Sequence, residues 1–373
     1  MAGSRKRGNY VGEWFGYRLY PTANSTAKAL TTWRNSTCPY LSEATGEPRR
    51  CVKAEASLGV CSINTETPLG RRDWLVCPYR ALDPKLLDEA VRRLFARSAT
   101  EHFEVLPVVR FNDVAERHKV ISTLKSGVGV YVYLDQKLGG EVSLGKTARS
   151  PEFSIDVTIL ELRLSGDDVA VERFGALEIQ TMDFHGSYKH AVKNLQDGLR
   201  LHPKNFASVL DQNPSWMSDK IEGPNLSNVF KRTFYQMAFK FQLGRGVGCV
   251  GTVLALPKSV WESWRHQLGD PVFERGEHAA LTKPGTSLPA HPLAWIFSFD
   301  LCKSTNDGPD DIRFDEIIAT SAEALSYWAL EVAPVHAMEF AMSEQGLPRS
   351  IRGLVHRVWP ELAARIQIAG PPN

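Results

Sequence analysis

Long hydrophobic runs are missing from this sequence of 373 residues. The longest apolar runs that the chain does contain, such as residues 127–134, are far shorter than the roughly 20 residues that a membrane-spanning helix requires. The first seven residues are basic but lead into no apolar segment, so they do not resemble a secretory signal. We therefore expect a protein of the cytoplasm, with no membrane as its partner.

An excess of either charge is also missing. The chain has 44 Lys and Arg residues against 42 Asp and Glu, which gives a net charge of +2. Overall charge therefore does not indicate a nucleic-acid partner, and any DNA-binding surface must be local. Residues 220–245 hold five Lys and Arg but one acid, Glu222. This stretch is compatible with a solvated helix face or with a phosphate-binding surface.

A CxxC pair is absent too, although the chain has six cysteines. Four of them, Cys38, Cys51, Cys61 and Cys77, are separated by gaps of 12, 9 and 15 residues, which excludes the usual zinc-ribbon and zinc-finger signatures. The sequence allows three states for these four cysteines: two disulfides, unpaired thiols or a four-cysteine metal site. The lack of a secretory signal counts against the disulfides. The tripeptide Cys-Pro-Tyr begins at both Cys38 and Cys77 and suggests two similar turns around one ion.

The remaining composition is that of a globular protein, with 43% hydrophobic and 23% charged residues. Residues 1–80 contain the four clustered cysteines and many turn formers, and we interpret them as a small N-terminal module. Residues 81–373 form the larger domain in this interpretation. Its first helix starts at Asp83 and Pro84, a helix cap followed by proline at the first helical position.

Hydrophobic periodicity predicts alternating strands and helices in the larger domain. We expect strands at 127–134, 153–162, 173–182, 249–256 and 294–301, and helices at 84–95, 187–203, 226–241, 258–268 and from about 314. The short gap between the second and third strands favours an antiparallel hairpin. The pattern is typical of an α/β protein with a mixed sheet.

That hairpin carries the residues most suited to chemistry. Glu178 and Gln180 are two positions apart on a strand, so they share one face while Ile179 points to the other. Asp156, on the partner strand, can bring a second carboxylate beside Glu178, and two carboxylates suit Mg²⁺. An exposed hairpin face explains the same spacing. However, both acids lie within strongly apolar strands, where a carboxylate is costly to bury unless it is paired or hydrogen-bonded.

Longer segments add a resemblance to a known family. Residues 136–141, 150–156, 177–190 and 222–236, with 73–78 and 80–84, are similar to the NotI-like type II restriction endonucleases of the PD-(D/E)xK nuclease superfamily. The similarity covers most of residues 10–300 and fades afterwards. It implies the nuclease fold of that superfamily, a mixed sheet flanked by helices, here with the small N-terminal module.

The resemblance also implies roles for single residues. Asp156 and Glu178 would bind catalytic Mg²⁺. Gln180, a third catalytic residue, occupies the position where most of the superfamily has lysine, and its amide would orient the attacking water or reach the phosphate. Glu141 resembles an additional active-site acid, although an exposed turn glutamate is the simple alternative. The four clustered cysteines would hold a structural iron, and the sequence does not distinguish iron from zinc.

The implied partner is double-stranded DNA, cut by a homodimer at a palindrome that we expect to be rich in G·C pairs. A companion DNA methyltransferase is expected in the host. Candidate phosphate contacts are His185, Lys189, Lys231 and Arg232, and the histidine could equally be an ordinary surface group. The alternatives are a structure-specific repair or junction nuclease of the same fold, and a metal-stabilised DNA-binding protein that does not cleave.

Overall fold

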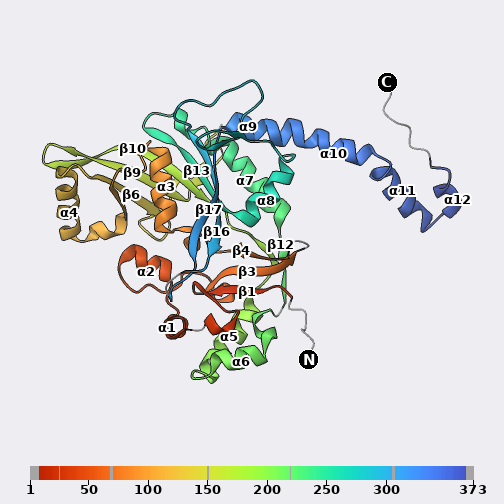
Figure 1. The fold of residues 1–373 in the computed structure, drawn as a ribbon, viewed down its shortest axis with the longest axis horizontal. Coiled ribbons are helices and arrows are strands. Elements are labelled where there is room, and N and C mark those ends of the chain that lie inside the picture. Colours follow the sequence, from red (N-terminus) through yellow and green to blue (C-terminus); the bar gives the residue numbers. More distant parts are fainter. Residues whose placement is uncertain are drawn as a thin grey trace.

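The chain folds as a mixed α/β protein around a nine-stranded mixed sheet (Figure 1). The computed structural model describes residues 8–24, 26–67, 70–148, 151–218, 220–304 and 307–366. Across the sheet the strands are β14 (Glu274–Arg275), β15 (Ala279–Ala280), β17 (Asp311–Thr320), β16 (Ala294–Cys302), β13 (Cys249–Pro257), β10 (Asp168–Ile179), β9 (Val157–Ser165), β6 (Gly129–Asp135) and β5 (Phe103–Pro107). Strands β10, β13 and β16 are parallel, whereas β9 is antiparallel to both β10 and β6.

Helices cover both faces of this sheet. On one face α3 (Pro84–Leu94) packs its apolar stripe into a cluster with Leu177 and Val253. On the other face α7 (Leu226–Lys240) and α8 (Lys258–Gln267) pack against Leu254. Val253 and Leu254 are consecutive on β13, and strand residues alternate between faces, so the two clusters lie on opposite sides. The predicted mixed sheet flanked by helices is confirmed.

A second, four-stranded sheet lies at the N-terminal end, in the order β2 (Tyr17–Arg18), β1 (Tyr10–Trp14), β3 (Val60–Thr67) and β4 (Gly70–Leu75). Its core is shared with α1 (Ala27–Asn35), α5 (Lys189–Leu201) and α6 (Phe206–Gln212). Trp33 of α1, for example, lies edge-on against Phe206, with ring centroids 5.7 Å apart. Packing therefore continues across residue 80, where the sequence suggests a boundary.

The other elements are short or peripheral. They are α2 (Pro39–Thr45), α4 (Val114–Lys125), β7 (Val142–Leu144), β8 (Phe153–Ile155), β11 (Phe184–Gly186), β12 (Ile221–Pro224), α9 (Ala322–Tyr327), α10 (Ala333–Met342), α11 (Leu347–His356) and α12 (Pro360–Ala363). Strands β7 and β8 form one two-stranded sheet, and β11 and β12 form another. Among the described residues, no helix is both long enough and apolar enough to cross a membrane.

Most predicted elements are found, and two of them differ. The hairpin of β9 and β10 is antiparallel as expected, with Val157 opposite Leu177. The predicted strand at 153–162 is interrupted at Asp156, because β8 pairs with β7 and β9 pairs with β10. The prediction of a helix from about 314 is wrong, because Phe314 lies in β17, which pairs with β16. The helix begins at Ala322, after Ser321 caps it.

Candidate active site

Asp156 sits at the break between β8 and β9, directly beside Glu178 of β10. The Asp156 carboxylate oxygen Oδ2 accepts a hydrogen bond from the backbone N–H of Ile179 at 3.0 Å. The backbone N–H of Asp156 donates to Oε1 of Glu178 at 3.4 Å. The hairpin therefore brings these two carboxylates together, as the sequence predicts.

Glu178 and Gln180 both point toward α7. Glu178 is 3% exposed, and its Oε2 forms an ion pair with Nζ of Lys240, which is also 3% exposed. Gln180 accepts a hydrogen bond from the hydroxyl of Thr233 through Oε1, and its amide nitrogen donates to the carbonyl of Thr181. The prediction that Glu178 and Gln180 share one face is thus confirmed. Both ends of the Gln180 amide are hydrogen-bonded to protein groups.

The carboxylates of Asp156 and Glu178 together have more negative charge than the nearby ammonium of Lys240 can neutralise. Burial and the nearby charge of Asp156 together raise the pKa of Glu178 to about 8, although Lys240 opposes both. Burial also raises the pKa of Asp156, against the hydrogen bond from Ile179 and the charge of Lys240. A buried and a half-buried carboxylate thus lie beside one ammonium, so the site favours a proton or an additional cation.

Lys240 is a site residue that the sequence analysis did not single out. It is three positions after Met237 and seven after Thr233, and all three are buried on the core face of α7. A lysine on the apolar face of a helix needs a buried acid as its partner. That periodicity is the signal in the sequence that could have identified it.

Asp135 is a second residue that the sequence analysis missed. It is buried at the end of β6, where its Oδ1 accepts a hydrogen bond from the backbone N–H of Lys137 at 2.9 Å. Burial raises the pKa of Asp135, and the charges of Asp156 and Glu141 raise it further. Glu141, which is half-buried, follows the double glycine after β6 and lies close enough for its charge to raise the pKa of Asp156.

The carboxylates can hold Mg²⁺ with few protein ligands. Among the described residues, no group of three or more His, Cys, Asp or Glu side chains is placed so as to hold a metal. The close set is therefore the pair Asp156 and Glu178, with Asp135 and Glu141 as electrostatic neighbours. Magnesium keeps several waters and is commonly bound through one or two carboxylates, so this pair fits the ion.

The predicted phosphate-contact residues are all exposed. His185 lies on β11, Lys189 begins α5, and Lys231 and Arg232 lie on the outer face of α7. Arg232 forms an ion pair with Asp183 at 3.0 Å, which ties the start of β11 to α7. Helix α7 therefore presents cations to solvent and Lys240 to the carboxylate pair.

The four clustered cysteines line one small cavity between α2, β3 and the turn that follows β4. Cys38 caps α2 and Cys77 caps the short helical turn Pro78–Ala81, each followed by proline at the first helical position. The repeated tripeptide thus forms two similar turns, as predicted. All six cysteines of the chain are free, so the thiols are not joined in disulfides.

The pKa values of two of these thiols, Cys77 and Cys38, are shifted in opposite directions. A hydrogen bond from the Cys61 thiol lowers the pKa of Cys77, and the charge of Lys53 and the backbone N–H groups that follow Cys77 lower it further. Burial raises the pKa of Cys38 to about 12. Although the cysteines surround one cavity, their sulfurs do not meet the geometry of a bound metal. Thiolates suit iron and zinc, so these four cysteines are the residues that would hold such an ion if one binds here.

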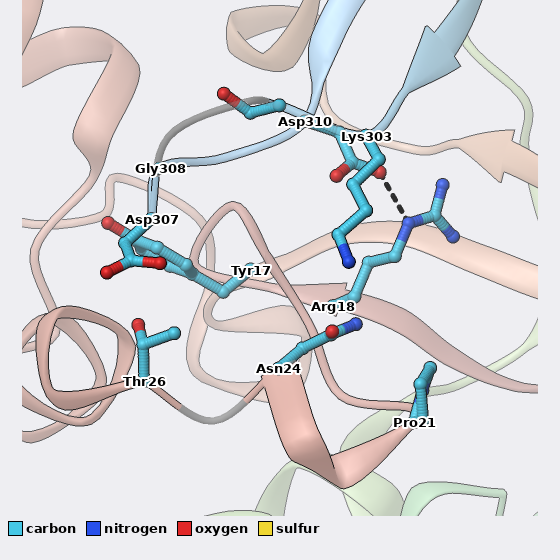
Figure 2. A pocket seen from close by; sticks show the side chains of 10 residues that line it. Tyr17, Arg18, Pro21, Asn24, Thr26, Lys303, Asp307, Gly308 and Asp310 are labelled. Carbon is cyan, nitrogen blue, oxygen red and sulfur yellow. Dashed lines mark hydrogen bonds and ion pairs between the residues drawn. The ribbon is translucent and has the colours of Figure 1, made fainter.

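A separate polar cavity lies beside the N-terminal sheet (Figure 2). Its cation Arg18 donates to Asp310 and, at 2.7 Å, to Asp73. Arg80, which is fully buried, donates to Glu13 at 3.1 Å and to the carbonyl of Asp310 at 2.6 Å. Both arginines are engaged by protein groups, so this network joins the N-terminal sheet to the connection between β16 and β17.

Arg80→Met should lower the free energy of unfolding by about 3–5 kcal/mol, because Glu13 would stay buried without its counterion. The exposed ion pair of Arg200 with Asp197 provides the control, and Arg200→Met should cost roughly 0.5 kcal/mol or less. Urea unfolding followed by circular dichroism measures both. Equal losses in the two variants would contradict a structural role for the buried pair.

No family model matches the chain, and no curated protein is similar to it at a significant level. Fold and site together define a mixed α/β protein with a carboxylate pair, one buried and one half-buried, at a β-hairpin, and with four cysteines that line one cavity.

Proposed function

We propose that the chain is a Mg²⁺-dependent type II restriction endonuclease with the PD-(D/E)xK fold. The observation that carries the proposal is the pair Asp156 and Glu178, a half-buried and a buried carboxylate brought together at the β9–β10 hairpin, with the ammonium of Lys240 paired to Glu178. Buried like charges are costly unless a cation or proton joins them. A divalent ion held by these two side chains removes that cost.

Each side chain then has a defined task. Asp156 and Glu178 hold Mg²⁺, which when bound would activate a water and stabilise charge on the scissile phosphate. The N–H of Ile179 fixes the orientation of Asp156. Gln180, engaged by Thr233 and Thr181, positions α7 against β10. Glu141 contributes negative charge from the neighbouring loop.

Lys240 supplies the positive charge that glutamine cannot provide at position 180. Its ammonium contacts Glu178 from α7, so it reaches the carboxylate from a helix while the superfamily lysine would come from the strand itself. We assign it as a positioning residue, which orients Glu178 and opposes the rise in its pKa before a metal binds.

The substrate is double-stranded DNA. His185, Lys189, Lys231 and Arg232 are exposed cations or polar groups near the carboxylate strand and α7, where they can contact phosphates. Two copies would be needed to cut both strands of a palindrome, which we expect to be rich in G·C pairs. The enzyme would act in the cytoplasm, with a companion methyltransferase protecting host DNA.

The four cysteines would hold a structural iron, or zinc in its place. Removing one thiolate should release the ion and unfold the surrounding turns, because metal binding and folding are coupled in such sites. We therefore expect one tightly bound iron or zinc per native chain by elemental analysis, and less than about a tenth of that in Cys61→Ser. Cys249→Ser, which changes a buried cysteine outside the cluster, is the control. A metal-free native protein that is fully folded would contradict the assignment.

The proposed activity is tested by incubating the purified chain with phage DNA and Mg²⁺. Discrete bands with uniform ends support a restriction enzyme, and sequencing the ends gives the site and the overhang. Nicking that depends on DNA structure would indicate a repair or junction nuclease. A gel shift without cleavage would indicate a metal-stabilised DNA-binding protein.

A further inference from the structure

The C-terminal arm, residues 328–366, leads away from the two sheets (Figure 1). It comprises the helical turn Trp328–Val332 followed by α10, α11 and α12. The arm meets the body at its root, where a Cβ atom on Gly269 would lie 3.2 Å from the Cα of Ala333. Not one residue of α10 is buried. A helix with this much exposed surface lacks the tertiary packing that normally stabilises helices in proteins.

The arm is also unusually apolar. Of the 22 large hydrophobic side chains exposed within the described residues, 11 lie in this arm. They include Phe340, Met342, Leu347, Leu354, Val358 and Trp359. Exposed hydrophobic side chains scattered singly are ordinary on a protein surface, whereas half of those in the described residues gather in this one arm. Such a concentration is typical of an interaction site.

The charges of the arm are divided between its two halves. Residues 328–344 carry three Glu and no Lys or Arg, whereas residues 345–366 carry four Arg and one Glu. Arg352 pairs with Glu344 inside the chain, but Glu331, Glu339, Arg357 and Arg365 form no ion pair with any described residue. Two antiparallel copies of the arm would place each acidic half beside a basic half.

We propose that the arm is a dimerisation element, which packs antiparallel along the arm of a second copy of this chain about a two-fold axis. Such an interface is isologous, because the same surface is complementary to itself. The apolar side chains form its centre, and the two halves of opposite charge set the antiparallel direction. The dimer would form whether or not the chain cuts DNA.

Sedimentation equilibrium of the full chain tests the interface. We expect the native protein to be a dimer at micromolar concentration. Phe340→Glu combined with Leu354→Glu should weaken the dimer by about 30-fold or more, because charge replaces apolar contacts at its centre. Leu201→Glu is the matched control, because Leu201 of α5 and Leu354 are both leucines with 61% exposure. The control should stay dimeric, and circular dichroism should show native folding in both proteins.

Charge reversal tests the direction of packing. Glu331→Lys with Glu339→Lys should weaken the dimer, and so should Arg357→Glu with Arg365→Glu. A mixture of these two proteins should form heterodimers, because each places complementary halves opposite the other. A native chain that stays monomeric at 50 µM would overturn the proposal, as would an unchanged dimer in the Phe340 and Leu354 variant. A monomer that sediments with phosphatidylcholine vesicles would also overturn it and would make the arm a membrane contact.

Discussion

Asp156→Asn should reduce Mg²⁺-dependent cleavage of duplex DNA by at least about 1,000-fold, because metal-ion catalysis supplies several kcal/mol of transition-state stabilisation. Asparagine keeps an oxygen that can accept the N–H of Ile179, so the hairpin should be preserved. Removing one of two like charges should leave the free energy of unfolding unchanged or higher. Mg²⁺ affinity, measured by titration calorimetry, should fall at least about tenfold. Glu178→Gln should show the same loss of cleavage.

The control for this substitution is Glu152→Gln. Glu152 is an exposed acid four residues before Asp156, on the other side of the break in the strand. It lies near the site in sequence but outside the carboxylate pair, so cleavage and Mg²⁺ affinity should stay native. Full cleavage by Asp156→Asn, or loss of cleavage in both variants, would remove the pair from the mechanism. Cleavage is scored on the substrate that the native enzyme cuts.

Lys240→Met should lower the free energy of unfolding of the metal-free protein by about 3 kcal/mol or more, because breaking a buried ion pair leaves a charge without its counterion. Methionine fills the space of the lysine stem, so the loss reflects charge more than volume. Adding Glu178→Leu should recover most of the loss, because the uncompensated carboxylate is then gone. The difference between single and double variants gives the coupling energy of the pair.

Lys231→Met on the same helix is the matched control, because Lys231 is exposed on the outer face of α7. Its unfolding free energy should stay within about 0.5 kcal/mol of the native value. Its DNA affinity should fall and become less dependent on salt, because one phosphate contact is lost. Stability loss in Lys231→Met comparable to that in Lys240→Met would show that the charge of Lys240 has no special partner.

Much of the fold could be predicted because it follows from local patterns. Asp83 and Pro84 mark the start of α3, and the spacing of Val229, Thr233 and Met237 predicts the core face of α7. Strand 314–320 could not be predicted in this way. Its residues form a strand because β16 lies beside them on one side and β15 on the other, and that pairing comes from distant parts of the chain.

The candidate site could be predicted only where it depends on local strand geometry or on the motif of the family. Strand parity placed Glu178 and Gln180 on one face, and the resemblance to the nuclease family selected Asp156 and Glu141. Lys240 and Asp135 were missed, since neither belongs to the motif of the hairpin. A periodicity argument can place a lysine on the core face of a helix, but it does not say which acid lies beneath it.

By itself the sequence determined the alternation of strands and helices, the face shared by Glu178 and Gln180, and the two similar turns at Cys38 and Cys77. These features depend on neighbours a few residues apart, whose geometry the backbone sets directly. Only the tertiary structure decided that Lys240 meets Glu178 across 62 positions in the chain, and that four distant thiols line one cavity. Such contacts depend on how helices and strands pack together, and packing is a property of the whole chain.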